Sequence, residues 1–215
     1  MLDHVLIDYD LERFPFPSVV AAHVGSPLDR LHEHHSYDRL ARGTEQHTPL
    51  HAHLYAIGPS FHELYRSFVE DVVAPAIGDD LLFQRIPNFR FQLPGNVAVR
   101  GFHRDRDDGH QEAEINCWVP LTRVEESSAV WIESVEGKGD HRPVLVQPGD
   151  MLVFDGANLE HGNVVHDGGS TRVSFDFRVV RRSLFETSDR RSMYRSVRFD
   201  IGEYFSPSLV RSATV

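Results

Sequence analysis

The pattern of apolar and polar positions changes character near residue 84. Upstream the chain reads as mainly helical or irregular, whereas downstream it consists of short runs rich in β-branched and aromatic residues, separated by Pro, Gly and Asn. Such runs are typical of strands. The predicted strands are FRFQL (89–93), VAVRGF (97–102), INCWVPL (115–121), AVWIESV (129–135), PVLVQ (143–147), MLVFD (151–155), NVVH (163–166) and RVSFDFRVV (172–180). Many short strands with few helices between them favour a sandwich or a barrel.

One amphipathic helix is predicted from Ser60 to about residue 74. Ser60 and Glu63 have the spacing of a capping box, and Pro75 and Gly78 mark the end of the pattern. The apolar residues between these signals recur at helical spacing: Phe61, Leu64, Tyr65, Phe68 and Val72. This apolar stripe must pack against another element.

The last predicted strand, RVSFDFRVV, alternates strictly between two kinds of side chain. Successive strand residues point to opposite faces, so one face is apolar and the other is charged. The charged face carries Arg172, Ser174, Asp176 and Arg178. Two interpretations remain open: an edge strand with one face in water, or a strand whose charged face lines a cup while its apolar face packs on the helix of residues 60–74.

Composition and charge narrow the function classes. The chain has 215 residues and 40% hydrophobic side chains, which fits one domain with one core. A formal net charge of −10 disfavours nucleic acid or an anionic membrane as a partner and favours a cationic ligand. The single cysteine, Cys117, fits a reducing compartment. Without a basic leader or a long apolar run, we expect a soluble cytoplasmic protein; the oligomeric state is left open.

The stretch FHRDRDDGH, residues 102–110, is the first candidate metal site. In an extended strand His103 and Asp105 point to the same side, so an imidazole and a carboxylate can reach one ion. A lone His-x-Asp pair arises about once by chance in a chain with this many histidines and aspartates. A calcium loop is excluded, because no carboxylate ladder starting here has both the required glycine and the final glutamate. Residues 107–110 then form the loop that leaves the strand.

A third candidate ligand, His161, makes the prediction of a metal site specific, because the sequence around it is distinctive. His161 follows a predicted strand and turn in LVFDGANLEHGN, and Arg172 and Ser174 follow in TRVSFDFR. Together with the strings GFHRD, EINCWVPLT and VWIES, this arrangement resembles the Fe(II)/2-oxoglutarate-dependent oxygenases, in particular the streptomycin-biosynthesis-type branch of aminoglycoside pathways. The similarity is strong over residues 84–180 and looser in TPLHAHLY and FDIGEYF.

The resemblance implies a cupin-like jelly roll, the double-stranded β-helix, as an all-β core with flanking helices. One oxygenase domain would span residues 1–215: a helical or irregular part at about 1–83, the core at about 84–180 and a tail at about 181–215. It also implies that His103, Asp105 and His161 hold one Fe(II), leaving three positions for 2-oxoglutarate and O2. Arg172 and Ser174 would bind the far carboxylate of 2-oxoglutarate.

Other residues are weaker candidates. Asn116 and Trp118 share a strand face and either touch cosubstrate or substrate, or serve as a structural hydrogen bond and a core indole. Arg90 and Gln92 share another face and could line the pocket. Ammonium groups of a cationic substrate could pair with three carboxylates that otherwise are solvated or pair with arginines: Glu133, Asp155 and Asp176. The histidine-rich stretches LHEHHSYD and QHTPLHAHLY could suggest a second metal site, but loops are favoured.

The predicted function is oxidation of a C–H group in a small polar natural product, foremost an aminoglycoside or aminocyclitol intermediate. Hydroxylation, epimerisation and oxidative ring closure such as orthoester formation remain open. An intact Asp105 argues against a halogenase, since the carboxylate occupies the halide position. The alternatives are a non-catalytic cupin-like metal or sugar-binding module, which would not need Arg172 and Ser174, and a protein hydroxylase.

Overall fold

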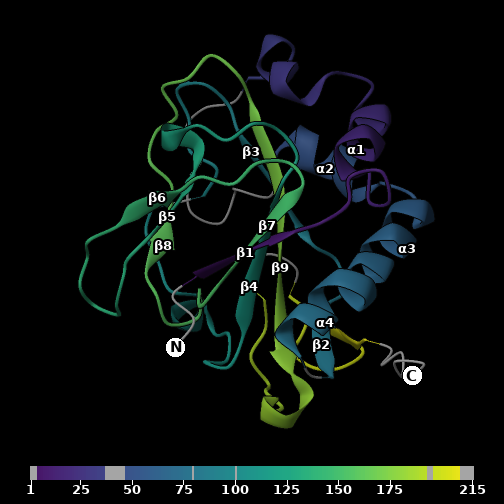
Figure 1. Ribbon diagram of the computed structural model, residues 1–215, viewed down its shortest axis with the longest axis vertical. Helices are drawn as coiled ribbons and strands as arrows, with labels where there is room; N and C mark the ends of the chain where they lie inside the picture. Colours follow the sequence, from purple (N-terminus) through teal and green to yellow (C-terminus); the bar gives the residue numbers. More distant parts are fainter. Residues whose placement is uncertain (1–3, 37–46, 79, 100, 193–195, 209–215) are drawn as a thin grey trace.

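The computed structural model describes residues 4–36, 47–78, 80–99, 101–192 and 196–208. Two antiparallel sheets form the core (Figure 1). The large sheet has the order β1 (His4–Asp8), β7 (Asp150–Phe154), β4 (Ile115–Pro120), β9 (Arg172–Arg181), β2 (Leu81–Gln84) and β10 (Phe205–Pro207), and β3 (Asn88–Gln92) also pairs with β9. The small sheet has the order β6 (Arg142–Val144), β5 (Val130–Ile132) and β8 (His161–Gly162). This is the predicted double-stranded β-helix.

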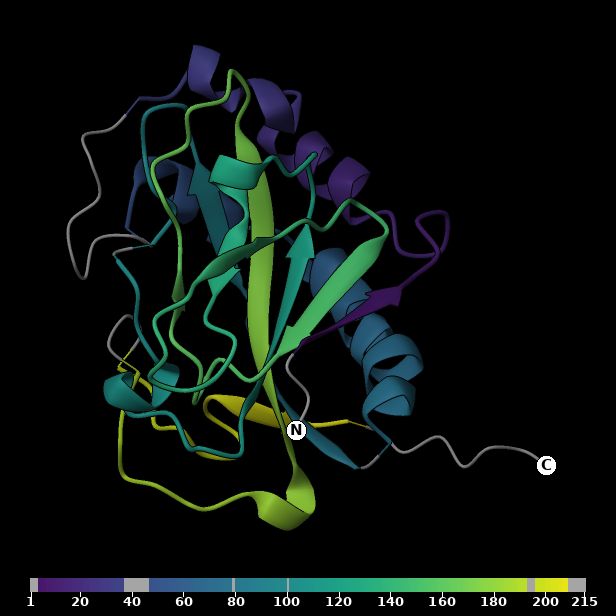
Figure 2. The same ribbon diagram turned by 60° about the vertical axis from the view of Figure 1, so that its left-hand side comes forward.

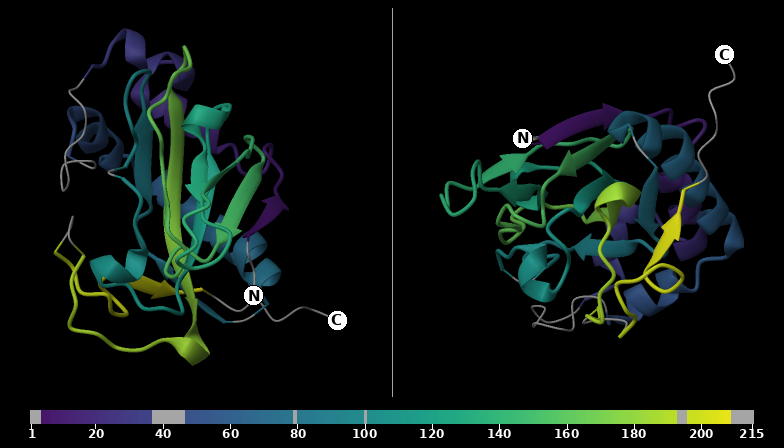
Figure 3. Two further views of the ribbon diagram at one scale, coloured as in Figure 1. Left: turned by 90° about the vertical axis from the view of Figure 1, so that its left-hand side faces the viewer. Right: turned by 90° about the horizontal axis from the view of Figure 1, so that it is seen from below.

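The helices lie on one side of the large sheet and the small sheet lies on the other (Figures 1 and 2). The view from below in Figure 3 shows the same separation. The α-helices are α1 (Phe16–Val24), α2 (Pro49–Tyr55), α3 (Pro59–Phe68) and α4 (Ala74–Ile77), with a π turn, η2 (Val69–Val73), between α3 and α4. Short 3-10 turns are η1 (Leu28–Glu33), η3 (Asp105–Asp108), η4 (Glu126–Ser128) and η5 (Arg182–Leu184).

Strand β9 is central, because it pairs with β4 on one side and with β2 and β3 on the other. Its apolar face packs on α3: the ring centroids of Phe175 and Phe61 lie 6.1 Å apart, and those of Phe177 and Tyr65 lie 5.1 Å apart. Its charged face is buried as well. Of the two interpretations of this strand, the cup is therefore correct and the edge strand is wrong.

The amphipathic helix exists, but its predicted start is wrong and it continues past residue 74 to the predicted end signal Gly78. Gly58 is the N-cap and Pro59 the first residue, so Ser60 lies inside the helix and no side chain caps it. The helix does not stop before Pro75, because the π turn directly upstream accommodates a residue that lacks an N–H. Gly78 ends it with a φ of 79°, a left-handed conformation that glycine adopts without strain.

Several strand predictions are also wrong. The described residues of the stretch 97–102 form no strand, since 98, 99, 101 and 102 are bends, and residues 163–166 are irregular because β8 ends at Gly162. Strands β1 and β10 lie in the flanks that were expected to be helical, irregular or tail, and β2 begins at Leu81, upstream of residue 84. The stretch PLHAHLY, expected as a loop, is helix α2, and part of the other histidine-rich stretch, residues 37–38, lies outside the described residues.

In the described part of the chain, no helix combines the length and the apolar character that crossing a membrane would require.

We expect Phe175→Ala to lower the free energy of unfolding by about 3 to 5 kcal/mol, because it leaves a cavity where sheet and helices meet. Phe175 is fully buried and its ring contacts those of Phe16, Phe61 and Tyr65. Urea denaturation followed by circular dichroism measures the change. Leu184→Ala is the control, since Leu184 is 52% exposed. A loss no larger than that of the control would contradict the packing described here.

Candidate metal centre

Three side chains from two distant segments meet inside the cup. Two reciprocal backbone hydrogen bonds join the segments, since the N–H of His103 donates to the carbonyl of His161 and the reverse, both at 2.9 Å. His103 Nε2 lies 3.5 Å and His161 Nε2 lies 3.8 Å from Asp105 Oδ1. The ligand atoms of the three residues all lie within 4.8 Å of one another. The three predicted metal ligands are therefore close enough to bind one ion.

The backbone conformation that places Asp105 beside His103 differs from the predicted strand. His103 forms an isolated bridge with His161, and Asp105 is the first residue of the 3-10 turn η3. The N–H of Asp105 donates to the carbonyl of Gly156 at 3.0 Å, which fixes the start of this turn. A turn, rather than the alternation of an extended strand, brings His103 and Asp105 together.

The imidazole of His161 is held with its Nε2 atom on the side of Asp105. His161 Nδ1 donates to the carbonyl of Leu159 at 3.0 Å, so its Nε2 carries the lone pair that a metal needs. Burial, together with a smaller contribution from the nearby His103, lowers the pKa of His161 to about 4. Its imidazole is therefore neutral near pH 7, as a metal ligand must be.

The carboxylate of Asp105 is anchored on its outer oxygen. Oδ2 accepts hydrogen bonds from Asn116 Nδ2 at 2.8 Å and from Arg178 Nε at 2.9 Å. Burial alone would raise the pKa of Asp105, but the guanidinium of Arg178 and the neighbouring histidines hold it well below its usual range. Asp105 is therefore ionised, with Oδ1 directed at the two imidazoles.

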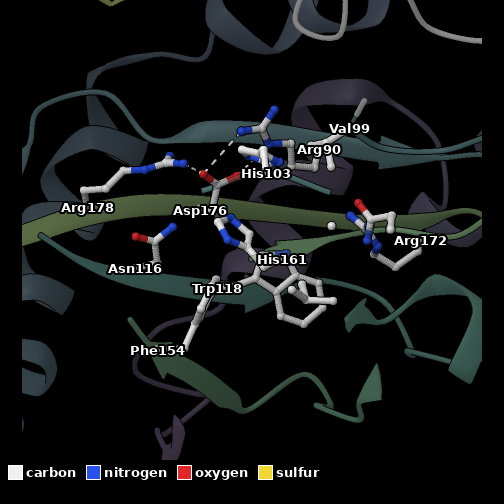
Figure 4. A pocket seen from close by; sticks show the side chains of 13 residues that line it. Arg90, Val99, His103, Asn116, Trp118, Phe154, His161, Arg172, Asp176 and Arg178 are labelled. Carbon is white, nitrogen blue, oxygen red and sulfur yellow. Dashed lines mark hydrogen bonds and ion pairs between the residues drawn. The ribbon is translucent and has the colours of Figure 1, made fainter. Parts of the chain in front are cut away.

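A buried chain of ion pairs continues from Asp105 across the sheet. Arg178 Nη1 lies 2.5 Å from Asp176 Oδ2, and Arg90 Nε lies 2.6 Å from Asp176 Oδ1. Asn88 also donates to Asp176 at 3.2 Å. Burial opposes ionisation, but the two guanidinium groups and Asn88 lower the pKa of Asp176 to about 2. Figure 4 shows Asp176 between Arg178 and Arg90, above His161.

Arg172, the cation predicted to bind 2-oxoglutarate, lies at the opposite end of these residues from Arg178 (Figure 4). Arg172 is 1% exposed. Its Nη1 donates to Ser174 Oγ at 2.8 Å, its Nη2 to Gln92 Oε1 at 2.8 Å and its Nε to the carbonyl of Ser128 at 3.0 Å. The guanidinium carbon lies 5.5 Å from the ring centroid of Trp118. Arg172 is thus a cation held in one orientation next to a hydroxyl group.

A cavity connects the metal ligands with Arg172. It is lined by Arg90, Val99, His103, Asn116, Trp118, Val130, Phe154, His161, Gly162, Asn163, Arg172, Asp176 and Arg178. Of the residues predicted for cosubstrate or substrate, Gln92 and Ser174 contact Arg172 from behind this lining. The sequence argument did not assign Val99, Val130, Phe154, Gly162 or Asn163 to the site. Gly162 and Asn163 could have been found from the sequence, since they directly follow the predicted ligand His161.

Two predicted substrate residues do not line the cavity. Glu133 is 1% exposed and accepts hydrogen bonds from Arg104 Nη2 at 3.0 Å, from the N–H of Glu160 at 2.7 Å and from the N–H of Gly139 at 3.1 Å. Burial opposes ionisation, but these donors lower the pKa of Glu133 to about 2. Asp155 accepts a hydrogen bond from the side chain of Asn158 at 2.9 Å. Both carboxylates therefore stabilise the segments beside the site.

Glu133, His141 and Glu160 form a second group with metal-like spacing. His141 Nε2 lies 2.8 Å from Glu160 Oε2. The oxygens of Glu133, however, already accept from a guanidinium and from backbone N–H groups, and a cation beside Arg104 would be repelled. This group does not fit a metal ion as well as the first one.

No family model matches the chain, but comparison with individual proteins places it in a family. The chain is 39% identical over 206 residues to the streptomycin biosynthesis protein StrG of Streptomyces griseus, covering 95% of this chain and 98% of that protein.

Two solved structures share the fold at low sequence identity. The non-haem alpha-ketoglutarate dependent carbocyclase SnoK from nogalamycin biosynthesis aligns with a TM-score of 0.56 and 10% identity, over 83% of this chain and 79% of that one. The epimerase SnoN from the same biosynthesis, also non-haem and alpha-ketoglutarate dependent, aligns with a TM-score of 0.54 and 13% identity, over 83% and 78%. The chain therefore belongs to the family of the streptomycin biosynthesis protein StrG, and its fold is that of the Fe(II)/2-oxoglutarate-dependent oxygenases.

Proposed function

We propose that the protein is an Fe(II)/2-oxoglutarate-dependent oxygenase that oxidises a C–H group of a small natural-product intermediate. One observation carries the proposal: a cluster of two histidines and one aspartate lies at one end of a cavity, and a guanidinium beside a hydroxyl lies at the other. A simple metal-binding module would have no need for the second group. Membership in the StrG family supports the biosynthetic setting.

The donor set fits Fe(II). Two imidazoles and one carboxylate on the same face of an octahedral ion leave three positions for other ligands, which is the arrangement of non-haem iron oxygenases. Here His103 Nε2, His161 Nε2 and Asp105 Oδ1 would be the protein's ligands. With iron bound, the reduction of O2 would be coupled to conversion of 2-oxoglutarate into succinate and CO2.

The far carboxylate of 2-oxoglutarate would be bound by Arg172 and Ser174. A guanidinium presents two parallel N–H donors to a carboxylate, and a neighbouring hydroxyl adds a third donor. Gln92 and the carbonyl of Ser128 hold this guanidinium in place, and Trp118 lies against it. The cosubstrate would therefore meet a site that is already oriented, so little ordering is needed on binding.

The substrate class is the finer part of the proposal. StrG is a streptomycin biosynthesis protein, and we infer a related substrate, an aminoglycoside or aminocyclitol intermediate. A net charge of −10 would attract such a cation toward the protein. The attraction would arise from the field of the whole molecule, because Asp176, the one carboxylate in the lining described above, already pairs with Arg90 and Arg178. A cytoplasmic location, where 2-oxoglutarate is available, belongs to this proposal.

We expect Asp105→Ala to abolish the Fe(II)-dependent conversion of 2-oxoglutarate to succinate, because the ion would lose its only carboxylate ligand among the three. Succinate is quantified by mass spectrometry after incubation with Fe(II), 2-oxoglutarate and ascorbate. Asp189→Ala is the control, since Asp189 is exposed and lies outside the cavity lining. If Asp105→Ala consumed 2-oxoglutarate at the wild-type rate, the ligand assignment would be wrong.

Arg172→Lys should weaken 2-oxoglutarate binding by about 2 to 5 kcal/mol, because a point charge cannot replace the two-pronged donor in a buried site. The apparent KM for 2-oxoglutarate measures the change. Arg123→Lys serves as the control, since Arg123 is exposed and lies outside the cavity lining. An unchanged KM in Arg172→Lys would remove Arg172 from this role.

A cationic substrate should support succinate formation better than its neutral counterpart, and the advantage should shrink as salt rises, because screening at about 0.15 M limits electrostatic reach to roughly 8 Å. The measurement compares a panel of aminoglycosides with the same compounds after N-acetylation, at low and high salt. Equal activity on both sets would defeat the cationic-substrate proposal and leave the oxygenase proposal standing.

A further inference from the structure

The two oxygens of the Asp105 carboxylate have different surroundings. Oδ2 lies 2.9 Å from both Nε and Nη2 of Arg178 and 2.8 Å from Nδ2 of Asn116. Oδ1 instead faces the Nε2 atoms of His103 and His161. A carboxylate oxygen has about two lone-pair sites, so the guanidinium of Arg178 and the amide of Asn116 together occupy Oδ2.

Both donors are themselves fixed. The other amino group of Arg178 lies 2.5 Å from Asp176, which Arg90 and Asn88 hold in turn. These contacts set the plane of the Arg178 guanidinium, because all three of its nitrogens are directed at carboxylates.

Asn116 is confined by the backbone on its other side. A Cβ atom added at Gly156 would lie 2.4 Å from Asn116 Nδ2, so only glycine leaves room for this side chain. Among the described residues, Asn116 Oδ1 is buried without a hydrogen-bond partner, and the side chain's hydrogen bond is the one to Asp105. Burying an oxygen without a hydrogen-bond partner costs free energy. The hydrogen bond from Asn116 Nδ2 to Asp105 offsets part of this cost.

Saturation of Oδ2 limits how Asp105 can bind a metal. A carboxylate can coordinate through one oxygen or through both, and the second mode fills one more position on the ion. If the proposed function is correct, two positions must remain for 2-oxoglutarate and one for O2. We propose that Arg178 and Asn116 are positioning residues that keep Asp105 a one-oxygen ligand and thereby reserve a coordination position for the cosubstrate.

Two variants remove the same contact by different chemistry. Gly156→Ala pushes Asn116 away from Asp105 without changing a polar group, and Asn116→Leu removes the donor while keeping the branching and the number of heavy atoms of the side chain. Gly58→Ala is the matched control, because Gly58 has a φ of −70° and a Cβ there would meet nothing within 4 Å. Circular dichroism and thermal unfolding of the metal-free proteins verify that each variant folds.

Metal and cosubstrate binding are measured separately. Calorimetry with Mn(II) gives the metal affinity of the full-length chain. Titration of the anaerobic Fe(II) protein with 2-oxoglutarate, followed by the charge-transfer absorption of the chelated keto acid, gives the cosubstrate affinity. We expect both variants to bind Mn(II) at least as tightly as the wild type, because a second oxygen of Asp105 can then join the ion. We expect them to bind 2-oxoglutarate at least about 10-fold more weakly, which corresponds to about 1.4 kcal/mol.

Other outcomes overturn the proposal. A loss of Mn(II) affinity in both variants would mean that Asn116 only orients or supports the ligand. Unchanged affinity for 2-oxoglutarate would mean that Asp105 does not compete for its position. These results differ from failure of the proposed function itself, in which the wild-type Fe(II) protein would show no charge-transfer absorption with 2-oxoglutarate.

Discussion

The rest of the structure depends on one buried pair of contacts, in which the guanidinium of Arg178 lies between the carboxylates of Asp105 and Asp176. Each of these charges would be costly to bury alone, and together they compensate one another. The three residues come from η3 and β9, and Arg90 of β3 completes the set. Because removing any member would leave an uncompensated charge inside the cup, the sheet and the metal centre stabilise each other.

The spacing of the metal ligands is set by backbone contacts. His103 and His161 exchange two backbone hydrogen bonds, and a Cβ on Gly162 would lie 2.7 Å from the carbonyl of Gly101, so the two segments can approach only with glycine there. Glu133 adds a third connection, since it binds Arg104 from one segment and the N–H of Glu160 from the other. Sites whose ligands are carried by such a rigid frame keep their geometry in the absence of the ion.

The sequence predicted those parts of the structure that depend on local pattern. Strict alternation identified the two faces of β9. The motif context assigned His103, Asp105, His161 and Arg172 to one site. The location of Glu133 could not be predicted, because its partners are a side chain and backbone N–H groups that only the folded chain brings together. Strands β8 and β10 are short, at two and three residues, and their pairing arises from the partner strand instead of their own composition. The sequence of β1, HVLID, does carry the residues of a strand, but it is isolated from the other strand patterns by the helical part of the chain.

The position of Arg178 in the chain also determines when the centre can form. His103, Asp105 and His161 all precede β9, yet the cation that balances Asp105 lies near the end of this strand. While the chain is being synthesised, the earlier residues emerge first, and Asp105 then lacks the guanidinium that compensates its charge on burial. The order of the residues thus implies that the carboxylate of Asp105 stays in water until β9 has been synthesised.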